Sequence, residues 1–164
     1  MSPVQITGPL APISLTALGR YADGVIWQVD QAISGLTSLT PVRGSLIARH
    51  RGNVVEVEGQ ATAIVTLSCD RCLQHYNQGL RVQQQEQLEI ATAVLAAATV
   101  EQAPDELLDP RGSFDPERWL FEHLSLQHPT VNRCGRDCPG PPRWGDAGDP
   151  SDPRWAALAR LRSS

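Results

Sequence analysis

The sequence predicts a single α+β domain in which antiparallel strands, forming a sheet or a partial barrel, precede short C-terminal helices. Three observations support this. Apolar and polar residues alternate within 41–67 and 80–90, capped helix starts lie at 115–117 and 151–153, and four cysteines form two close pairs. Because the strand-like runs come before the helices, the pattern does not indicate alternating βαβ units.

Composition agrees with one folded domain of 164 residues, since 41% of them are hydrophobic and 20% are charged. The net charge of −4 does not supply the basic field of a protein that binds phosphates broadly. Residues 130–164 are weakly basic, with six Arg against four Asp. All 14 basic residues are Arg, which excludes lysine Schiff-base chemistry.

The N-terminal region lacks the pattern of a secretory signal, and no run approaches the roughly 18 apolar residues of a membrane span. We therefore expect a cytoplasmic protein without a membrane partner. In a reducing compartment, paired cysteines serve as metal ligands or redox groups more often than as structural disulfides. Residues 1–24 show no sustained period, and we expect them to be extended or partly mobile.

The strands are predicted in order along the chain. Residues 25–30 alternate loosely and predict a strand, and residues 41–67 predict a hairpin that turns at Gly52 and Asn53. Gly59 interrupts the second arm as a bulge or bend would. Residues 80–90 alternate again, which favours a strand, although the Gln and Glu content also permits a helix.

The C-terminal part contains loops and two predicted helices. Residues 91–113 predict a loop with a short helix, and 139–150 a loop rich in Pro and Gly. Asp115 and Pro116 begin the first helix, and a second helix follows 151–153. Leu120 and Leu124 share a face of the first helix beside Phe121. We expect Trp27, Trp119 and Trp155 to lie in the core. We expect Trp144 to be exposed or to cover the cysteine site.

The four cysteines predict one closed structural metal site. Cys69 and Cys72 have the spacing C-x2-C, Cys134 and Cys138 have C-x3-C, and 61 residues separate the pairs. Two such turns can direct four thiolates onto one tetrahedral ion, for which zinc is the expected metal. The site would staple the C-terminal segment to the strand that ends at Cys69. Arg71 and Arg136, one in each pair, would soften the charge of the thiolates.

Other interpretations of the cysteines stay open, namely a redox C-x-x-C, an iron–sulfur site and free buried thiols. His75 lies three residues after Cys72 and is a conceivable substitute ligand. No catalytic motif of a hydrolase, a dinucleotide-binding protein or a phosphate-binding loop is present, so we assign no catalytic residue and no small-molecule substrate.

Three motifs in order resemble the YceD family. They are SCDRCLQHYNQ at 68–78, CGRDCPG at 134–140 and DPRWAALARL at 152–161, and the similarity runs from about Pro41 onward. The four cysteines match the family's cysteine positions. Many relatives carry two further cysteines after the second motif, where this chain reads GPPRWG. Any site that uses those extra ligands is not carried over, and the remaining four cysteines still suffice for one tetrahedral ion.

The resemblance implies a non-enzymatic role in accumulation of the large-subunit ribosomal RNA, and hence in biogenesis of the large ribosomal subunit. The expected partner is pre-ribosomal RNA or a large-subunit ribosomal protein. Arg71, Arg136, Arg143 and Trp144 are the expected contact residues. Two alternatives remain: a thiol-based redox or metal-sensing protein, and a metal-stapled interaction module unrelated to ribosomes.

Overall fold

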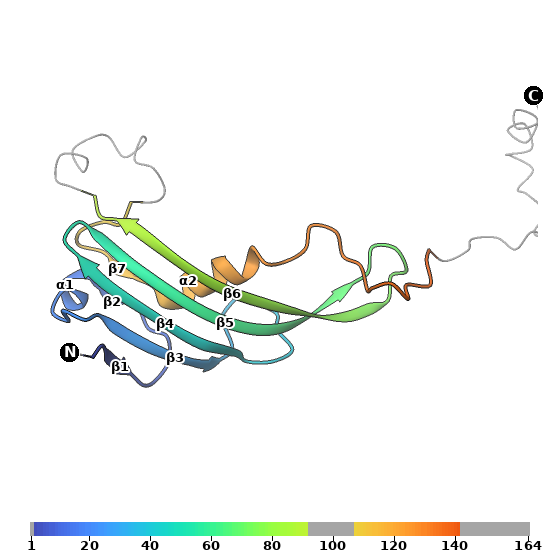
Figure 1. The fold of residues 1–164 in the computed structure, drawn as a ribbon, viewed down its shortest axis with the longest axis horizontal. Helices are drawn as coiled ribbons and strands as arrows, with labels where there is room; N and C mark the ends of the chain where they lie inside the picture. The colour runs from blue at the N-terminus through green and yellow to red at the C-terminus, as the bar shows by residue number, and fades with distance from the viewer. Residues whose placement is uncertain (1, 92–106, 142–164) are drawn as a thin grey trace, which may run out of the picture.

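The described residues form a strongly curved, mostly antiparallel sheet, and helix α2 (Pro116–Ser125) packs in its concavity (Figure 1). The structure is a computed structural model that describes residues 2–91 and 107–141. Five strands pair in the order β1-β3-β4-β5-β6. They are β1 (Val4–Ile6), β3 (Val25–Gln31), β4 (Val42–Arg51), β5 (Val54–Ser68) and β6 (His75–Glu89). The predicted α+β class is confirmed.

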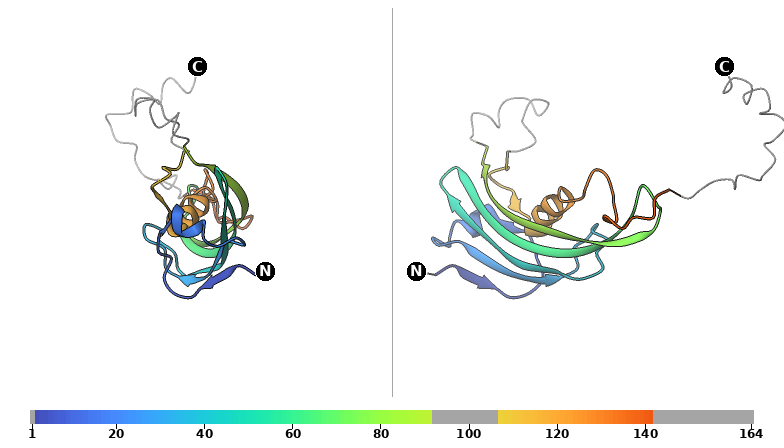
Figure 2. Two further views of the ribbon diagram at one scale, coloured as in Figure 1. Left: turned by 90° about the vertical axis from the view of Figure 1, so that its left-hand side faces the viewer. Right: turned by 45° about the vertical axis from the view of Figure 1, so that its right-hand side comes forward.

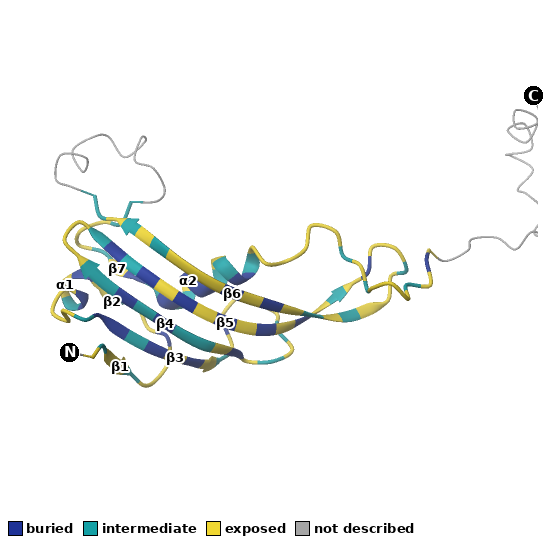
Figure 3. Ribbon diagram, in the orientation of Figure 1, coloured by how far each residue is buried: buried dark blue, intermediate teal, exposed yellow. Residues whose placement is uncertain are grey.

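All neighbouring strands are antiparallel except β1 and β3, which are parallel. The β4–β5 turn lies at Gly52 and Asn53 as predicted, and Gly52 has φ 65°, which favours glycine. The strand expected at 80–90 is confirmed and begins earlier, at His75. Alternating burial runs along β5 because its odd-numbered residues face the core and its even-numbered residues face solvent (Figure 3).

Gly59 corrects one prediction, because it is neither a bulge nor a bend. The β4–β5 register runs through it without a break, with Gly59 opposite Leu46. A Cβ at Gly59 would lie 2.5 Å from Cζ3 of Trp119 and 2.7 Å from Cδ1 of Leu46. Gly59 therefore provides the space in which Trp119 lies against the sheet.

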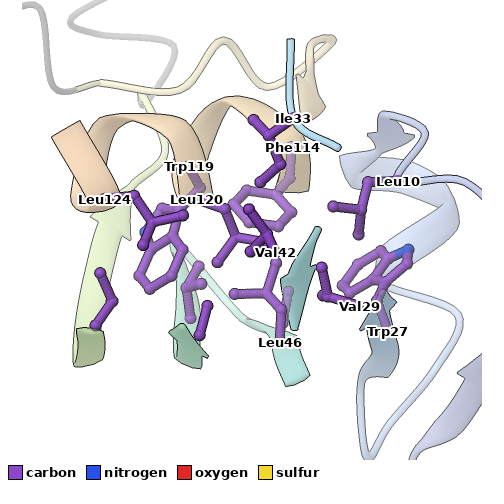
Figure 4. Packing of buried hydrophobic residues seen from close by; sticks show 14 of the residues in the cluster. Leu10, Trp27, Val29, Ile33, Val42, Leu46, Phe114, Trp119, Leu120 and Leu124 are labelled. Carbon is purple, nitrogen blue, oxygen red and sulfur yellow. The ribbon is translucent and has the colours of Figure 1, made fainter. Parts of the chain in front are cut away.

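Helix α2 (Pro116–Ser125) covers the concave face over β5 and β6 (Figure 2). Asp115 caps it as predicted, since its Oδ1 accepts the N–H groups of Glu117 and Arg118 at 3.0 and 3.1 Å. Leu120 and Leu124 are fully buried, and Phe121 packs against the core from the side. Figure 4 shows Leu120 on the side of α2 that faces Val42 of β4, and Leu124 beside Trp119.

Residues 2–24 contribute more structure than their irregular sequence indicates. They form β1, the short strand β2 (Ile13–Ser14) and the one-turn helix α1 (Leu15–Leu18). Strand β2 pairs with β7 (Ser113–Phe114), which brings the segment before α2 onto the N-terminal region. Leu10, Leu15 and Leu18 are buried and belong to the same core cluster as Trp27.

Several predictions fall outside the described residues. These are most of the loop and short helix of 91–113, most of the loop at 139–150, the second helix, and Trp155. Trp27 and Trp119 are buried as predicted, with 1% and 4% of their surface exposed. Within residues 2–91 and 107–141, no helix has the length and apolar character needed to cross a bilayer.

Candidate metal centre

The cysteine cluster lies at the far end of the β5–β6 hairpin. The β4–β5 ladder ends where Arg43 faces Thr62, whereas the β5–β6 ladder continues to the pair Ser68 and His75. The last residues of the hairpin therefore form a two-stranded ribbon that projects from the sheet (Figure 1). After α2, the chain runs along this projection and reaches the hairpin tip at residues 131–138.

The first cysteine pair lies in the turn between β5 and β6. Cys69 donates its N–H to the carbonyl of Gln74 at 2.9 Å, and Leu73 donates its N–H to the carbonyl of Cys69 at 2.9 Å. Leu73 has φ 62°, an unusual conformation for a bulky residue. The turn thereby places both thiols, Cys69 and Cys72, on the side that faces the C-terminal segment.

Two hydrogen bonds fix the C-terminal segment on this turn. Asp70 donates its N–H to the carbonyl of Asn132 at 2.9 Å, and Asn132 donates its N–H to Oδ2 of Asp70 at 2.7 Å. The second cysteine pair follows directly, with Gly135 at φ 129° between Cys134 and Cys138. A contact between one residue and another 62 positions away thus aligns the two cysteine turns.

The four cysteine sulfur atoms form one compact cluster. All four Sγ atoms lie within 4.8 Å of one another, with Cys69 and Cys138 at 3.9 Å and Cys72 and Cys134 at 3.6 Å. Zinc–sulfur bonds of about 2.3 Å in a tetrahedron place the sulfurs about 3.8 Å apart. Cys69 is fully buried and the other three are partly buried. This donor set fits a thiophilic ion and can hold a metal.

Thiol pKa values reflect the crowding of the cluster. The N–H of Cys72, with those of Arg71 and Cys134, lowers the pKa of Cys69 to about 6. Burial, together with the neighbouring Cys138, Cys72 and Cys69 thiols, raises the pKa of Cys134 to about 12. The N–H of Gln74 lowers the pKa of Cys72, but burial and the Cys69 side chain outweigh it, so the net direction is upward. A divalent cation would favour the thiolate forms and so oppose the upward pKa shifts of Cys72 and Cys134.

The other predicted site residues lie as follows. Arg71 and Arg136 are exposed, and a Cβ at Gly140 would lie 3.7 Å from Nη2 of Arg71, so this arginine lies beside the second cysteine turn. His75 is exposed on β6 and is not a member of the sulfur cluster. Arg143 and Trp144 lie outside the described residues.

Sequence reasoning missed three residues at the hairpin tip. Arg133 lines a shallow depression of about 350 Å³ together with Asp70, Arg71, Val131, Asn132 and Pro141. Asp70 and Asn132 hold the two segments together through the bonds described above. The proximity of Arg133 to Cys134 was its only sequence signal, whereas nothing local marks Asp70 and Asn132 as partners.

Away from the hairpin tip, a polar contact holds α2 on the sheet. Trp119 donates its Nε1–H to Oε2 of Glu86 at 2.7 Å, and His123 Nε2 lies 3.6 Å from the same oxygen. The Trp119 and His123 rings stack with their centroids 4.0 Å apart. Glu86 points into the concavity, where its carboxylate satisfies a buried indole donor.

Comparison with known proteins adds one match. A family profile described as large ribosomal RNA subunit accumulation protein YceD matches residues 57–162, which is well over half of the chain. The matched range includes all four cysteines of the cluster. No curated protein and no solved structure shows a significant match.

Proposed function

Because this chain belongs to the YceD family, we propose that it is a non-enzymatic factor supporting accumulation of the large-subunit ribosomal RNA. The family match is the observation that carries this proposal. In this proposal the protein acts in the cytoplasm, on precursors of the large ribosomal subunit. Among the described residues, the cysteine cluster is the most developed chemical site, and its closed geometry favours a structural role over catalysis.

We propose Cys69, Cys72, Cys134 and Cys138 as ligands of one structural zinc ion. The short sulfur–sulfur distances and the partial or complete burial of all four thiols support this assignment. When bound, zinc would supply the cross-link between the hairpin tip and the C-terminal segment. The chain's own contribution is the alignment of the two turns through Asp70 and Asn132.

The hairpin tip is the proposed contact surface for the pre-ribosomal partner, either RNA or a large-subunit ribosomal protein. Arg71, Arg133 and Arg136 are exposed there, and Leu73 and Val131 expose 63% and 54% of their surface. Exposed arginines beside apolar side chains are common in recognition surfaces. Arg143 and Trp144 remain predicted members of this surface.

Deletion of the gene tests the proposed function. The ratio of large-subunit to small-subunit ribosomal RNA should fall and should recover when the wild-type chain is supplied. The variant C72S/C134S should not restore the ratio, whereas Arg43→Ala, on β4 and outside the hairpin tip, should restore it. An unchanged ratio in the deletion strain would overturn the proposed function.

Sedimentation of ribosomal particles tests the contact surface separately. The wild-type chain should sediment with large-subunit precursors, and R71E/R133E/R136E should remain at the top of the gradient while keeping its metal content. Co-sedimentation of the triple variant at the wild-type level would remove the arginines from the contact surface and leave the family role intact.

A further inference from the structure

Hydrogen bonds, in addition to the cysteine cluster, join the two segments that carry the cysteines. Asp70 and Asn132 exchange hydrogen bonds of 2.9 and 2.7 Å between the β5–β6 turn and the C-terminal segment. These bonds use backbone groups and one carboxylate, and no thiol takes part. These bonds therefore hold the two turns face to face independently of any thiol–metal bond.

Two sulfur–sulfur contacts cross between these segments. Cys69 Sγ lies 3.9 Å from Cys138 Sγ, and Cys72 Sγ lies 3.6 Å from Cys134 Sγ. Each contact joins the first cysteine turn to the second. A disulfide needs an S–S distance of about 2.05 Å, so the two sulfurs of each contact must move closer before a bond forms.

We propose that the four cysteines are a peroxide-modification site that forms two disulfides across the segments, Cys69 with Cys138 and Cys72 with Cys134. The modification replaces a metal cross-link by a covalent one and keeps the hairpin tip attached to the C-terminal segment. It goes beyond the proposed function, because it concerns the response of this site to an oxidant and requires no ribosomal partner.

The chemistry balances with hydrogen peroxide as the oxidant. In each pair a partly exposed cysteine (Cys138 in one, Cys72 or Cys134 in the other) gives up its thiol proton to solvent, attacks a peroxide oxygen through sulfur, breaks the O–O bond, and forms a sulfenic acid and hydroxide. The second thiol of the pair then attacks the sulfenic sulfur and releases water. The hydroxide takes up a proton from solvent, so each disulfide consumes one peroxide and yields two waters, and any bound ion leaves with its ligands oxidised.

Tryptic peptide mapping can identify which cysteines are joined by a disulfide, because an arginine lies within each cysteine pair. Cleavage at arginine places the four cysteines on four different peptides, residues 52–71, 72–81, 134–136 and 137–143. The proposed disulfides join 52–71 to 137–143 and 72–81 to 134–136. Disulfides within each pair would join 52–71 to 72–81 and 134–136 to 137–143.

The experiment treats the reduced, metal-loaded full chain with hydrogen peroxide, blocks residual thiols and maps the tryptic peptides by mass spectrometry. We expect loss of one hydrogen for each of the four thiols, release of the metal to an indicator, and the two cross-segment peptide pairs as the main products. Treatment with a dithiol reductant should reverse the modification. Disulfides within the pairs, or sulfinic acids without disulfides, would overturn the proposal.

The variant Cys138→Ser tests the disulfide pairing independently. It removes one proposed disulfide and should still form the other, between Cys72 and Cys134. A disulfide between Cys69 and Cys72 in this variant would instead show that oxidation follows sequence proximity. The family role survives either result, since the ribosomal RNA ratio is measured without oxidant.

Discussion

Asp70 and Asn132 join the hairpin tip to the C-terminal segment: the Asn132 N–H donates to Oδ2 of Asp70 at 2.7 Å, and the Asp70 N–H donates to the carbonyl of Asn132 at 2.9 Å. The two residues lie beside the proposed ligands, one following Cys69 and the other preceding Cys134 by two positions. Partners of this kind orient metal ligands without touching the metal.

Replacing Asp70 with Ala should weaken metal binding, because the N–H of Asn132 loses its acceptor and the second turn loses its alignment. Changes of this kind reduce metal affinity by about 10- to 100-fold. Competition with a chelating indicator measures the effect. Asp70→Asn keeps an acceptor oxygen and should fall between the wild type and Asp70→Ala. The control Asp30→Ala removes an exposed carboxylate bonded to Arg43, and an equal loss in that variant would refute the positioning role.

Gly59→Ala should destabilise the fold by about 1–3 kcal/mol, because its Cβ would overlap Trp119 and Leu46. Gly79→Ala, on the neighbouring strand, is the matched control, since nothing lies within 4 Å of its Cβ position. Surface changes of that kind usually alter stability by less than about 0.5 kcal/mol. Urea unfolding compares the two variants. Similar midpoints would show that Trp119 does not lie on Gly59.

Glu86→Ala should cost about 1–3 kcal/mol, because the buried indole N–H of Trp119 loses its acceptor. Glu86→Gln keeps a carbonyl oxygen at the same place and should lose much less. Glu89→Ala, exposed on the same strand, controls for the loss of a carboxylate. Unfolding curves read by tryptophan fluorescence would contradict this contact if all three variants matched the wild type.

Metal affinity should rise with pH, because protons compete with the metal for thiolates. Near neutral pH the Cys69 thiol, with a pKa of about 6, is already ionised, whereas the raised pKa values of Cys72 and Cys134 mean that binding displaces their protons. As pH falls through about 6, Cys69 adds a further proton to the competition and the affinity falls more steeply. Calorimetric titration in buffers of different ionisation enthalpy counts the protons released. Release of fewer than two protons near pH 7 would contradict these directions.

In the metal-free chain, the lowered pKa of Cys69 has its own consequence for stability. A folded-state pKa of about 6, below the ordinary value of 9.0, stabilises the fold fully above pH 9.0, and this contribution disappears as pH falls through about 6. Cys134 has the opposite sign, since its pKa near 12 favours the fold below pH 9.0 and opposes it as pH rises toward 12. Denaturant unfolding across this range, with Cys69→Ser and Cys134→Ser, separates the two contributions.

Local patterns predicted the parts of the fold that local chemistry controls. Alternation along β5 and β6 and the Asp115–Pro116 helix start depend on neighbouring residues, and these predictions are confirmed. Gly59 was misinterpreted because its partner, Trp119, lies 60 positions away along the chain. The parallel pairing of β1 with β3 was likewise inaccessible, because three residues carry no usable period.

The candidate site also contains features that the local sequence predicts and features that depend on the fold. The spacing of the cysteines predicted a common site, and the sulfur atoms do meet. The Asp70–Asn132 contact depends on the path of the chain after α2, which no local motif encodes. Arg133 was not among the predicted contact residues, because only the folded hairpin tip brings it beside Arg71.

The most direct test of the central claim is metal analysis combined with X-ray absorption on the full chain purified under reducing conditions. We predict one zinc ion per chain, surrounded by four sulfur atoms at about 2.3 Å, and loss of that ion in C72S/C134S. A wild-type chain that contains no stoichiometric metal, or an ion with fewer than four sulfur ligands, would contradict the account.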